Sequence, residues 1–460
     1  MTESDLARVW GEGGNEIAAA MRAGLRFLDQ RDTGHLLTRV GQRIDEIPAI
    51  QPVDKGALTK SYGGGQEGAS DDLLVGRGLF YITEQRRLCL DCTAGHYQMV
   101  WGYNDPELCR AAAEAVEAGV VWDNHSNIPQ TPVKVLAKRL VEMANPAGTK
   151  ELDTVLLGCC TGSVACAAAL KTQLICHSRK RANPEAPVIV VLDGNYHGTD
   201  MMAQHMRGMW KGFFTGLLVL AVEPNDEKRL TEVFARYGKR IAGFWAEPIM
   251  MNREAIVVEP EYLQLARRLC DEVGALMCID EIQTGFWQPE VFAYRSLGIE
   301  PDLVIAGKGM TAGFHPLAAV IMKSQLDVLA QYDAISTNGS AALPAHVALC
   351  CIERILRNAR SIVEVGDRYM ERLKGLAREF PDVISQARGK RHLGGLKFRK
   401  REQAIAFHKR AVAAGLWVRV HAYHEGHGTL LTKLGLGADE RVVDFVIEKF
   451  RELLRVQLGS

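Results

Sequence analysis

The sequence lacks any long apolar run that is free of charge. No stretch reaches the roughly 18 to 20 residues that a membrane-crossing helix needs. The acidic start from Met1 to Asp5 also lacks the basic segment that opens a secretory signal peptide. Net charge is missing too, since 55 Lys and Arg balance 55 Asp and Glu, so nothing favours nucleic acid or an acidic membrane surface as a partner. We therefore expect a soluble, cytoplasmic protein that acts on small molecules.

Disulfide and zinc patterns are absent as well. The eleven cysteines are an odd number, and most lie in apolar runs or helical patterns, as reduced core residues do. Cys89 and Cys92 form a CxxC pair, but no second Cys or His pair stands at a zinc-like spacing. His421, His424 and His427 lie in a glycine-containing loop without Cys or Asp ligands. We expect no metal site.

What the sequence does contain is a series of short apolar runs bounded by glycine and proline, which are typical of fully buried strands. Five of them cover residues 154–157, 188–192, 241–246, 275–279 and 303–306. They alternate with helical stretches, which predicts a parallel sheet with right-handed crossovers. Ligands of such sheets bind outside the carboxyl ends of the strands, so we expect the catalytic groups there.

The residues that follow these five runs form a chemically coherent set. It consists of a glycine turn of phosphate size, an aromatic residue with a histidine beside it, two carboxylates and a lysine: Gly162, Ser163, Tyr196, His197, Glu247, Asp280 and Lys308. Such a set suits a phosphorylated, ring-shaped electrophile that condenses with an amine. Pyridoxal 5'-phosphate (PLP) is the simplest candidate.

Helical periodicity predicts the other main elements. We expect helices at residues 16–28, 107–118, 130–145, 165–176, 260–273, 345–358, 361–379 and 439–456, and a strand pair within 79–92. Residues 61–70 contain four glycines and are predicted to be a linker.

The motifs at the strand ends resemble the class III (omega) aminotransferase family, which are fold-type-I PLP enzymes. The resemblance runs from about Gly78 to the end of the chain. It is carried by Ala246-Glu247-Pro248, by Asp280-Glu281-Ile282-Gln283-Thr284-Gly285-Phe286, by Gly307-Lys308-Gly309, and by the shorter Thr161-Gly162-Ser163, Tyr196-His197-Gly198 and Thr337-Asn338-Gly339-Ser340.

The resemblance implies an α/β fold, with a mainly parallel central sheet flanked by helices and a smaller α+β domain from the N- and C-terminal parts. On this basis residues 1–100 form an N-terminal arm and part of the small domain. Residues 101–335 form the large PLP-binding domain, and residues 336–460 form the C-terminal small domain.

Lys308 and Asp280 are the expected catalytic residues. Lys308 would bond to the cofactor and then move a proton between the substrate and the cofactor. Asp280 would pair with the ring nitrogen and keep it protonated, so that the ring withdraws electrons. The plain alternatives are a solvated surface lysine and a helix-capping or ion-paired aspartate.

The remaining cofactor contacts follow from the same comparison. Gly162 and Ser163 would hold the phosphate at a helix start. Tyr196 would stack on the ring, Ile282 would fill its opposite face, and Gln283 would bond its phenolic oxygen. The alternatives are a generic turn for Gly162 and Ser163, and a buried tyrosine for Tyr196. For Ile282 and Gln283 the alternative is packing alone.

Three further residues are expected around the substrate and the subunit boundary. Thr337 resembles the threonine that reaches the phosphate in the other subunit, which implies a homodimer; otherwise it is a plain loop residue. Arg419 falls where several members bind a substrate carboxylate, although a surface arginine is the alternative. Glu247 would lie near Asp280 and Gln283, in either a structural or a catalytic role.

Departures from the family pattern surround the expected pocket. Thr199 stands where acetylornithine-type members carry a carboxylate-binding arginine, which disfavours that branch. Val164 replaces the usual glutamate, residues 287–289 replace a glycine-arginine pair, and residues 431–435 replace a segment ending in two prolines. These departures therefore leave room for an atypical substrate, or even an atypical reaction.

We predict a PLP-dependent aminotransferase that moves an amino group between a primary amine or amino acid and a keto acid by a ping-pong mechanism. A PLP-dependent racemase, decarboxylase or lyase of the same family is the alternative from another reaction class. A non-catalytic binding module is a second alternative, which the joint presence of Lys308, Asp280 and Gln283 disfavours.

Overall fold

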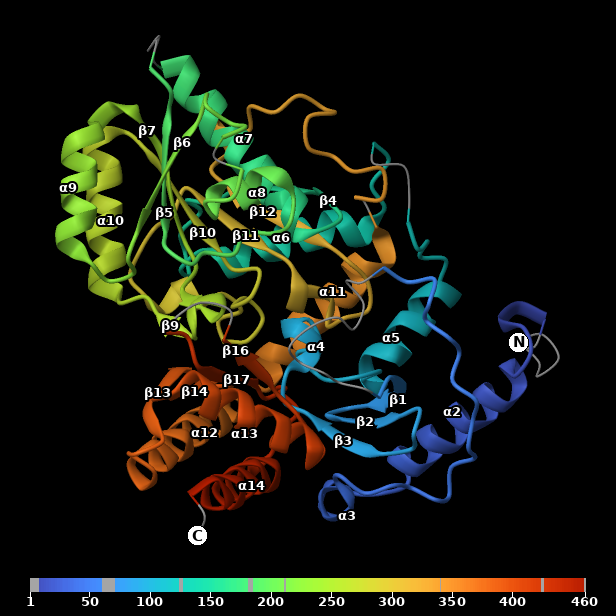
Figure 1. Ribbon diagram of the computed structural model, residues 1–460. Helices are drawn as coiled ribbons and strands as arrows, with labels where there is room; N and C mark the ends of the chain where they lie inside the picture. Colours follow the sequence, from blue (N-terminus) through green and yellow to red (C-terminus); the bar gives the residue numbers. More distant parts are fainter. Residues whose placement is uncertain are drawn as a thin grey trace. The chain divides into compact units, whose positions relative to one another are not determined.

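The computed structural model describes residues 8–59, 71–123, 127–180, 185–210, 212–339, 341–422 and 426–458. The chain forms two compact units (Figure 1). One is continuous, Pro106–Val363, and the other is built from both ends of the chain, Met1–Asp105 and Glu364–Ser460. The three-part division predicted above stays a prediction. The whole predicted linker, residues 61–70, lies outside the described residues, as do His424 and Ser340.

The continuous unit contains a seven-stranded sheet in the order β4-β12-β11-β10-β7-β5-β6. Its strands are β4 (Thr154–Cys159), β5 (Val188–Leu192), β6 (Leu218–Val222), β7 (Ile241–Ala246), β10 (Leu276–Asp280), β11 (Leu303–Ala306) and β12 (Ala318–Met322). β12 runs antiparallel to both of its neighbours, β11 and β4, and the other adjacent strands pair in parallel. The expected mainly parallel sheet is confirmed.

Buried side chains on both faces of this sheet explain the continuous apolar runs. Ile189 and Val191 of β5 belong to the core cluster that contains residues of α7, while Val188 and Val190 on the other face are also fully buried. A strand covered on both faces has no polar alternation. In Figure 1, α9 and α10 lie side by side next to the sheet.

The helices of this unit are α5 (Pro106–Glu117), α6 (Thr131–Ala144), α7 (Gly162–Lys180), α8 (Met201–Met206), α9 (Glu227–Tyr237), α10 (Pro260–Val273) and α11 (Ala342–Arg357). α12 (Ala359–Glu379) carries the chain into the other unit. The limits of α10 match the prediction because Pro260 opens its first turn and Gly274, at φ 71°, ends it. A short hairpin joins β8 (Ile249–Met250) and β9 (Ile256–Val257).

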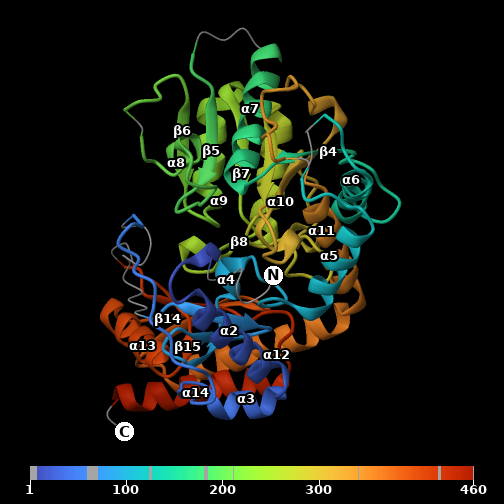
Figure 2. The same ribbon diagram turned by 90° about the vertical axis from the view of Figure 1, so that its right-hand side faces the viewer.

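The second unit combines two four-stranded sheets, seen in Figure 2 with α2, α3 and α14 around them. One sheet contains β1 (Leu73–Arg77), β2 (Phe80–Thr83), β3 (Leu88–Asp91) and β15 (Leu416–Trp417). The other contains β13 (Ile384–Lys390), β14 (Leu393–Phe398), β16 (Arg419–His421) and β17 (Thr429–Lys433). The helices are α2 (Gly14–Asp29), α3 (Thr33–Arg39), α4 (Ala94–Tyr97), α13 (Arg401–Ala413) and α14 (Glu440–Leu458).

The first of these sheets joins distant parts of the sequence. β2 and β3 form the predicted strand pair, and the two strands run antiparallel. β15 then adds in parallel to the free edge of β3, with Leu416 opposite Leu90. Leu416 and Leu90 are fully buried in one core cluster, so the two ends of the chain share this core.

Within the described ranges, no helix combines the length and the apolar composition needed to cross a membrane.

Candidate active site

The carboxyl ends of the strands enclose a cavity of about 120 Å³ within the continuous unit. Its lining contains five of the predicted site residues together with three of their neighbours: Thr161, Gly162, Ser163, Tyr196, His197, Gly198, Ile282 and Lys308. These side chains come from segments that follow β4, β5, β10 and β11. The topology therefore brings them together as the strand ends predicted.

Asp280, the last residue of β10, is buried and bonded through both carboxylate oxygens. Its Oδ1 accepts from the backbone N–H of Ile282 at 2.9 Å, and its Oδ2 lies 2.7 Å from Nδ1 of His197. Because an ionised carboxylate can only accept, Nδ1 of His197 carries the proton in this contact. Asp280 is thus held in a fixed orientation at the strand end.

His197 and Glu247 form a buried pair of titratable groups beside Asp280. Burial lowers the pKa of His197, but the hydrogen bond and charge of Asp280, aided by the charge of Glu247, outweigh burial and raise it above its usual value. Burial raises the pKa of Glu247 to about 7, and nearby His197 opposes that rise. One oxygen of Glu247 accepts from the N–H of Tyr196 at 3.0 Å.

Lys308 follows β11 and begins a short 3-10 turn, with φ 31°. Burial lowers the pKa of its amine, although the charges of Asp280 and Glu247 act in the opposite direction. Its Nζ lies 5.9 Å from the centre of the Tyr196 ring. A lysine with a lowered pKa is more often neutral and is therefore a better nucleophile.

The predicted phosphate turn begins α7, where backbone N–H groups are unpaired by the helix itself. Gly162 is the first residue of α7, and Oγ of Ser163 accepts from the N–H of Thr199 at 3.1 Å. Gly198 has φ 127°, and a Cβ there would lie 2.4 Å from Oγ of Ser163. Only glycine therefore fits at this contact.

Gln283 is buried and held by a residue that the sequence did not single out. Its Nε2 donates to Oδ1 of Asn252 at 3.1 Å, while its Oε1 is buried without a hydrogen-bond partner among the described residues. Ile282, next to it, would meet a Cβ placed on Gly162 at 2.6 Å. Ile282 therefore borders the phosphate turn.

Five predicted residues do not line this cavity: Asp280, Glu247 and Gln283, described above, and also Thr337 and Arg419. Thr337 is exposed and lies in a segment anchored to the end of β4, where the N–H of Ser336 donates to the carbonyl of Gly158 at 2.7 Å. Arg419 begins β16 in the discontinuous unit, where it contacts Nε2 of His96.

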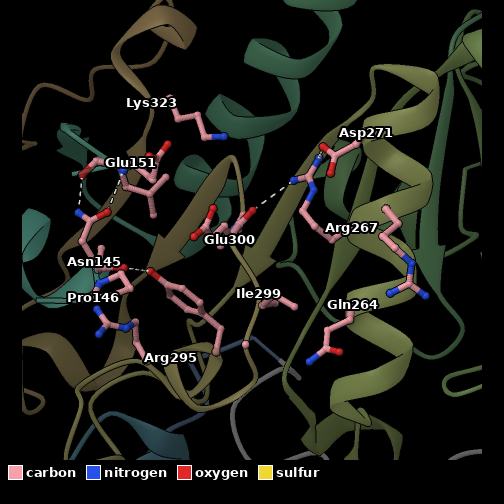
Figure 3. A pocket seen from close by; sticks show the side chains of 16 residues that line it. Asn145, Pro146, Glu151, Gln264, Arg267, Asp271, Arg295, Ile299, Glu300 and Lys323 are labelled. Carbon is pink, nitrogen blue, oxygen red and sulfur yellow. Dashed lines mark hydrogen bonds and ion pairs between the residues drawn. The ribbon is translucent and has the colours of Figure 1, made fainter. Parts of the chain in front are cut away.

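A larger cavity lies at the opposite end of the same sheet. It has a volume of about 600 Å³ and is lined by residues such as Gln264, Arg267 and Lys323 (Figure 3). Arg267 bonds Asp302 at 2.7 Å and Asp271 at 2.8 Å, and Lys323 also pairs with Asp302. Asp302 precedes β11 whereas Lys308 follows it, so this cavity is separate from the predicted catalytic groups.

The sequence indicated Glu247 as a neighbour of Asp280 but did not reveal two further residues beside it. His197 was noted only as a neighbour of Tyr196, and Cys166 only as a core residue, yet Sγ of Cys166 lies 3.7 Å from Oδ2 of Asp280. The ligand atoms of Cys166, His197 and Asp280 lie within 4.8 Å of one another. Burial raises the pKa of Cys166 well above its usual value. The hydrogen bonds that Cys166 and His197 make to Asp280 therefore explain why these three side chains lie close together.

A family model described as aminotransferase class III matches residues 74–425. An acetylornithine aminotransferase from Xylella fastidiosa is 30% identical over 328 residues, which cover 69% of this chain and 77% of that protein. The chain belongs to the class III aminotransferases.

Other class III aminotransferases and solved structures are also similar. A putrescine aminotransferase from Pectobacterium atrosepticum is 33% identical over 178 residues, 37% of this chain and 38% of that protein. A transaminase from the marine bacterium Virgibacillus has a TM-score of 0.75 at 20% identity, covering 89% of this chain and 98% of that one. The ornithine aminotransferase of Toxoplasma gondii has a TM-score of 0.73 at 20% identity, with coverages of 85% and 92%. These structures share the fold.

Class III aminotransferases use PLP, and the residues of the cavity fit this cofactor. The buried oxygens Oε1 of Gln283 and Oε1 of Glu247 have no partner in the described part of the chain. Such buried acceptors call for a ligand or water. The glycines at positions 162 and 198 leave space that a Cβ would fill. The chain is therefore a PLP-dependent aminotransferase.

Proposed function

We propose that Lys308 is the acid–base group of an amino transfer between a primary amine or amino acid and a keto acid, run in two half-reactions. The observation that carries this assignment is the half-buried Lys308, whose amine has a lowered pKa and which lines one cavity with the phosphate turn and Tyr196. In this proposal the amine of Lys308 would hold the cofactor, and when it is free the same nitrogen would move a proton to or from the substrate.

The bound cofactor supplies a ring that takes up the electrons of the broken substrate bond. Asp280 is proposed to bond the ring nitrogen and hold its proton. His197 supports this role because its N–H bonds Asp280 and its raised pKa favours the positively charged form beside the carboxylate. Gly162 and Ser163 would bind the phosphate, Tyr196 and Ile282 the two ring faces, and Gln283 the phenolic oxygen.

The donor is proposed to be an amine or amino acid other than acetylornithine. The relative from Xylella fastidiosa acts on acetylornithine by its name, but Thr199 here replaces the arginine of that branch. Arg419 is proposed to bind the carboxylate of an amino-acid or keto-acid partner, because its planar guanidinium suits a carboxylate. Glu247 would act through Asp280 rather than on the substrate.

We also propose a cytoplasmic homodimer. Thr337 would reach the phosphate in the other subunit, which fits its exposed side chain. All eleven cysteines are free thiols, as is typical of a reducing compartment.

A donor screen tests the function. Purified protein is mixed with a series of amines and amino acids, and the change in cofactor absorbance is recorded together with the keto product. A donor that converts the cofactor to its amine form and releases a keto product supports transamination. Release of carbon dioxide, racemised substrate or eliminated phosphate without that conversion would instead support another PLP reaction.

A further inference from the structure

Arg207 lies beside the ring of Tyr196, a residue that lines the catalytic cavity. It follows the last residue of α8, and the carbon at the centre of its guanidinium lies 5.3 Å from the centre of the Tyr196 ring. Nζ of Lys308 lies 5.9 Å from the same ring. The two cationic groups are therefore no farther apart than the sum of these distances.

Among the residues that the structure describes, no carboxylate pairs with the guanidinium of Arg207. No hydrogen bond or ion pair joins it to another residue in the described ranges, although its side chain is half-buried. Arg240 and Arg253, also half-buried in this unit, pair with carboxylates at 2.9 Å and 3.0 Å. Asp200, at the other end of α8, uses its Oδ1 to cap that helix.

The contact with the Tyr196 ring leaves the N–H groups of Arg207 available for a ligand. A guanidinium that lies over an aromatic face keeps its N–H groups in its own plane, where they match the two oxygens of a carboxylate. Three of the next six residues have apolar side chains that are exposed, with 46% exposure for Met209, 41% for Trp210 and 75% for Phe213. A ligand carboxylate here would thus be attached to an apolar body.

We propose that Arg207 binds a carboxylate at the end of the amino donor remote from its amine. The inference rests on the proposed amino transfer at Lys308 and names the substrate class: an amine joined to a carboxylate by an apolar chain or ring. Thr199 cannot form a carboxylate ion pair. Arg207 supplies the guanidinium from the end of α8 instead.

Two donors that differ only in the carboxylate test this role. The wild type should use 5-aminopentanoate with a higher kcat/KM than pentylamine. Arg207→Gln should lower kcat/KM for 5-aminopentanoate by about 10- to 100-fold, as expected for a lost charge-assisted hydrogen-bonded pair. It should change kcat/KM for pentylamine by no more than about twofold, because that donor makes no contact with the guanidinium. Arg207→Lys keeps the positive charge but not the paired N–H donors of the planar guanidinium. Its kcat/KM for 5-aminopentanoate should therefore fall less than that of Arg207→Gln.

Pentanoate binding gives a measurement that needs no turnover. Calorimetry of the holoenzyme should show affinity for pentanoate that falls about tenfold or more in Arg207→Gln. The matched control is Arg236→Gln, since Arg236 also lies over a tyrosine ring, 5.4 Å from the centre of Tyr237. That control should bind pentanoate as the wild type does. Circular dichroism checks the fold, and Arg207→Lys replaces Arg207→Gln if the latter misfolds.

Three outcomes would overturn the proposal: a wild type without preference for 5-aminopentanoate, equal losses on both donors, or unchanged kinetics and pentanoate affinity in the Arg207 variants. Equal losses would mean that Arg207 only supports Tyr196. Failure of the proposed function is recognised separately, because then no amine at all would convert the cofactor to its amine form.

Discussion

Asp280 and His197 act as one unit in this fold. Asp280 accepts from His197 and from the backbone of Ile282, so its carboxylate orientation is set by two donors from different segments. An amide at position 280 would have the same shape but no charge. It could not hold a proton on the cofactor ring nitrogen.

Asp280→Asn is expected to bind PLP and to lose several orders of magnitude in turnover. Each tenfold loss corresponds to about 1.4 kcal/mol of barrier. Cofactor titration and single-turnover reaction with a donor measure the two properties. Asp193→Asn is the control, because Asp193 also follows a strand but pairs with Arg253 outside the cavity. Near-wild-type turnover of Asp280→Asn would show that another group bonds the ring nitrogen.

Glu281, next to Asp280, predicts a pH-dependent stability. Burial raises its pKa from 4.5 to about 7, against the bonds from Thr284 and from the N–H of Tyr294. The folded protein therefore binds a proton that the unfolded chain releases between these values. The stabilising effect of that proton is fully present below about pH 4.5 and is lost as the pH rises to about 7.

Glu281→Gln should remove this loss of stability at rising pH. The amide can still accept from Tyr294 and donate to Thr284, so the hydrogen bonds are retained. Relative to the wild type, the variant should gain on the order of 3 kcal/mol in unfolding free energy between pH 5 and pH 8. Denaturant unfolding at both pH values measures it, with Glu290→Gln as control. A parallel decline in wild type and Glu281→Gln would assign the pH dependence to other groups.

At the scale of the elements, Gly198 controls the phosphate turn. Its φ of 127° is unfavourable for any side chain, and a Cβ would lie 3.0 Å from Cα of Ser163. Gly198→Ala should therefore displace the start of α7 and weaken PLP affinity by roughly 5- to 150-fold, the range for about 1 to 3 kcal/mol of strain. Equilibrium titration of the cofactor measures this effect.

Gly216→Ala is the matched control for that change. A Cβ at Gly216 would meet nothing within 4 Å, so its PLP affinity should equal that of the wild type. If Gly198→Ala also binds PLP normally, Ser163 does not take part in holding the phosphate.

The sequence predicted the strands and helices of the catalytic unit better than their directions. The run at 303–306 matches β11, and the helix at 260–273 matches α10, because buried runs and helix caps are local properties. β6 was not predicted, and neither was the reversal of β12. The direction of a strand depends on pairing with distant segments, which apolar periodicity does not encode.

The same difference separates the predicted and the missed site residues. Lys308 and Asp280 stand at strand ends, so the apolar runs that precede them in the sequence indicate their position. His197, Asn252 and Arg207 matter through contacts with Asp280, Gln283 and Tyr196, which only the folded chain brings together. No local pattern in the sequence marks such contacts.

At the scale of the whole molecule, the proposed role of Thr337 predicts shared sites in a dimer. Co-expression of Thr337→Ala with Lys308→Ala yields heterodimers with one intact Lys308. If Thr337 acts across the boundary, that lysine-bearing site receives its threonine from the other chain. It should bind PLP as the wild type does, whereas the Thr337→Ala homodimer should lose about 1.5 to 3 kcal/mol of affinity.

Cofactor titration of purified heterodimers distinguishes the two arrangements. Weak binding at the lysine-bearing site, equal to that of the Thr337→Ala homodimer, would place Thr337 in the site of its own chain. Lys308→Ala homodimers are the control for binding at the site without lysine.

The parallel pairing of β15 with β3 has a consequence for synthesis. A chain leaves the ribosome from its N-terminus, so β3 emerges early, and the part of its second edge at Leu90 and Asp91 stays open until Leu416 and Trp417 have been made. The uninterrupted segment Pro106–Val363 is complete by then. Open strand edges promote association between chains. A polypeptide released before β15 is made would therefore expose this edge, which ties the protection of the N-terminal strands to the completion of translation.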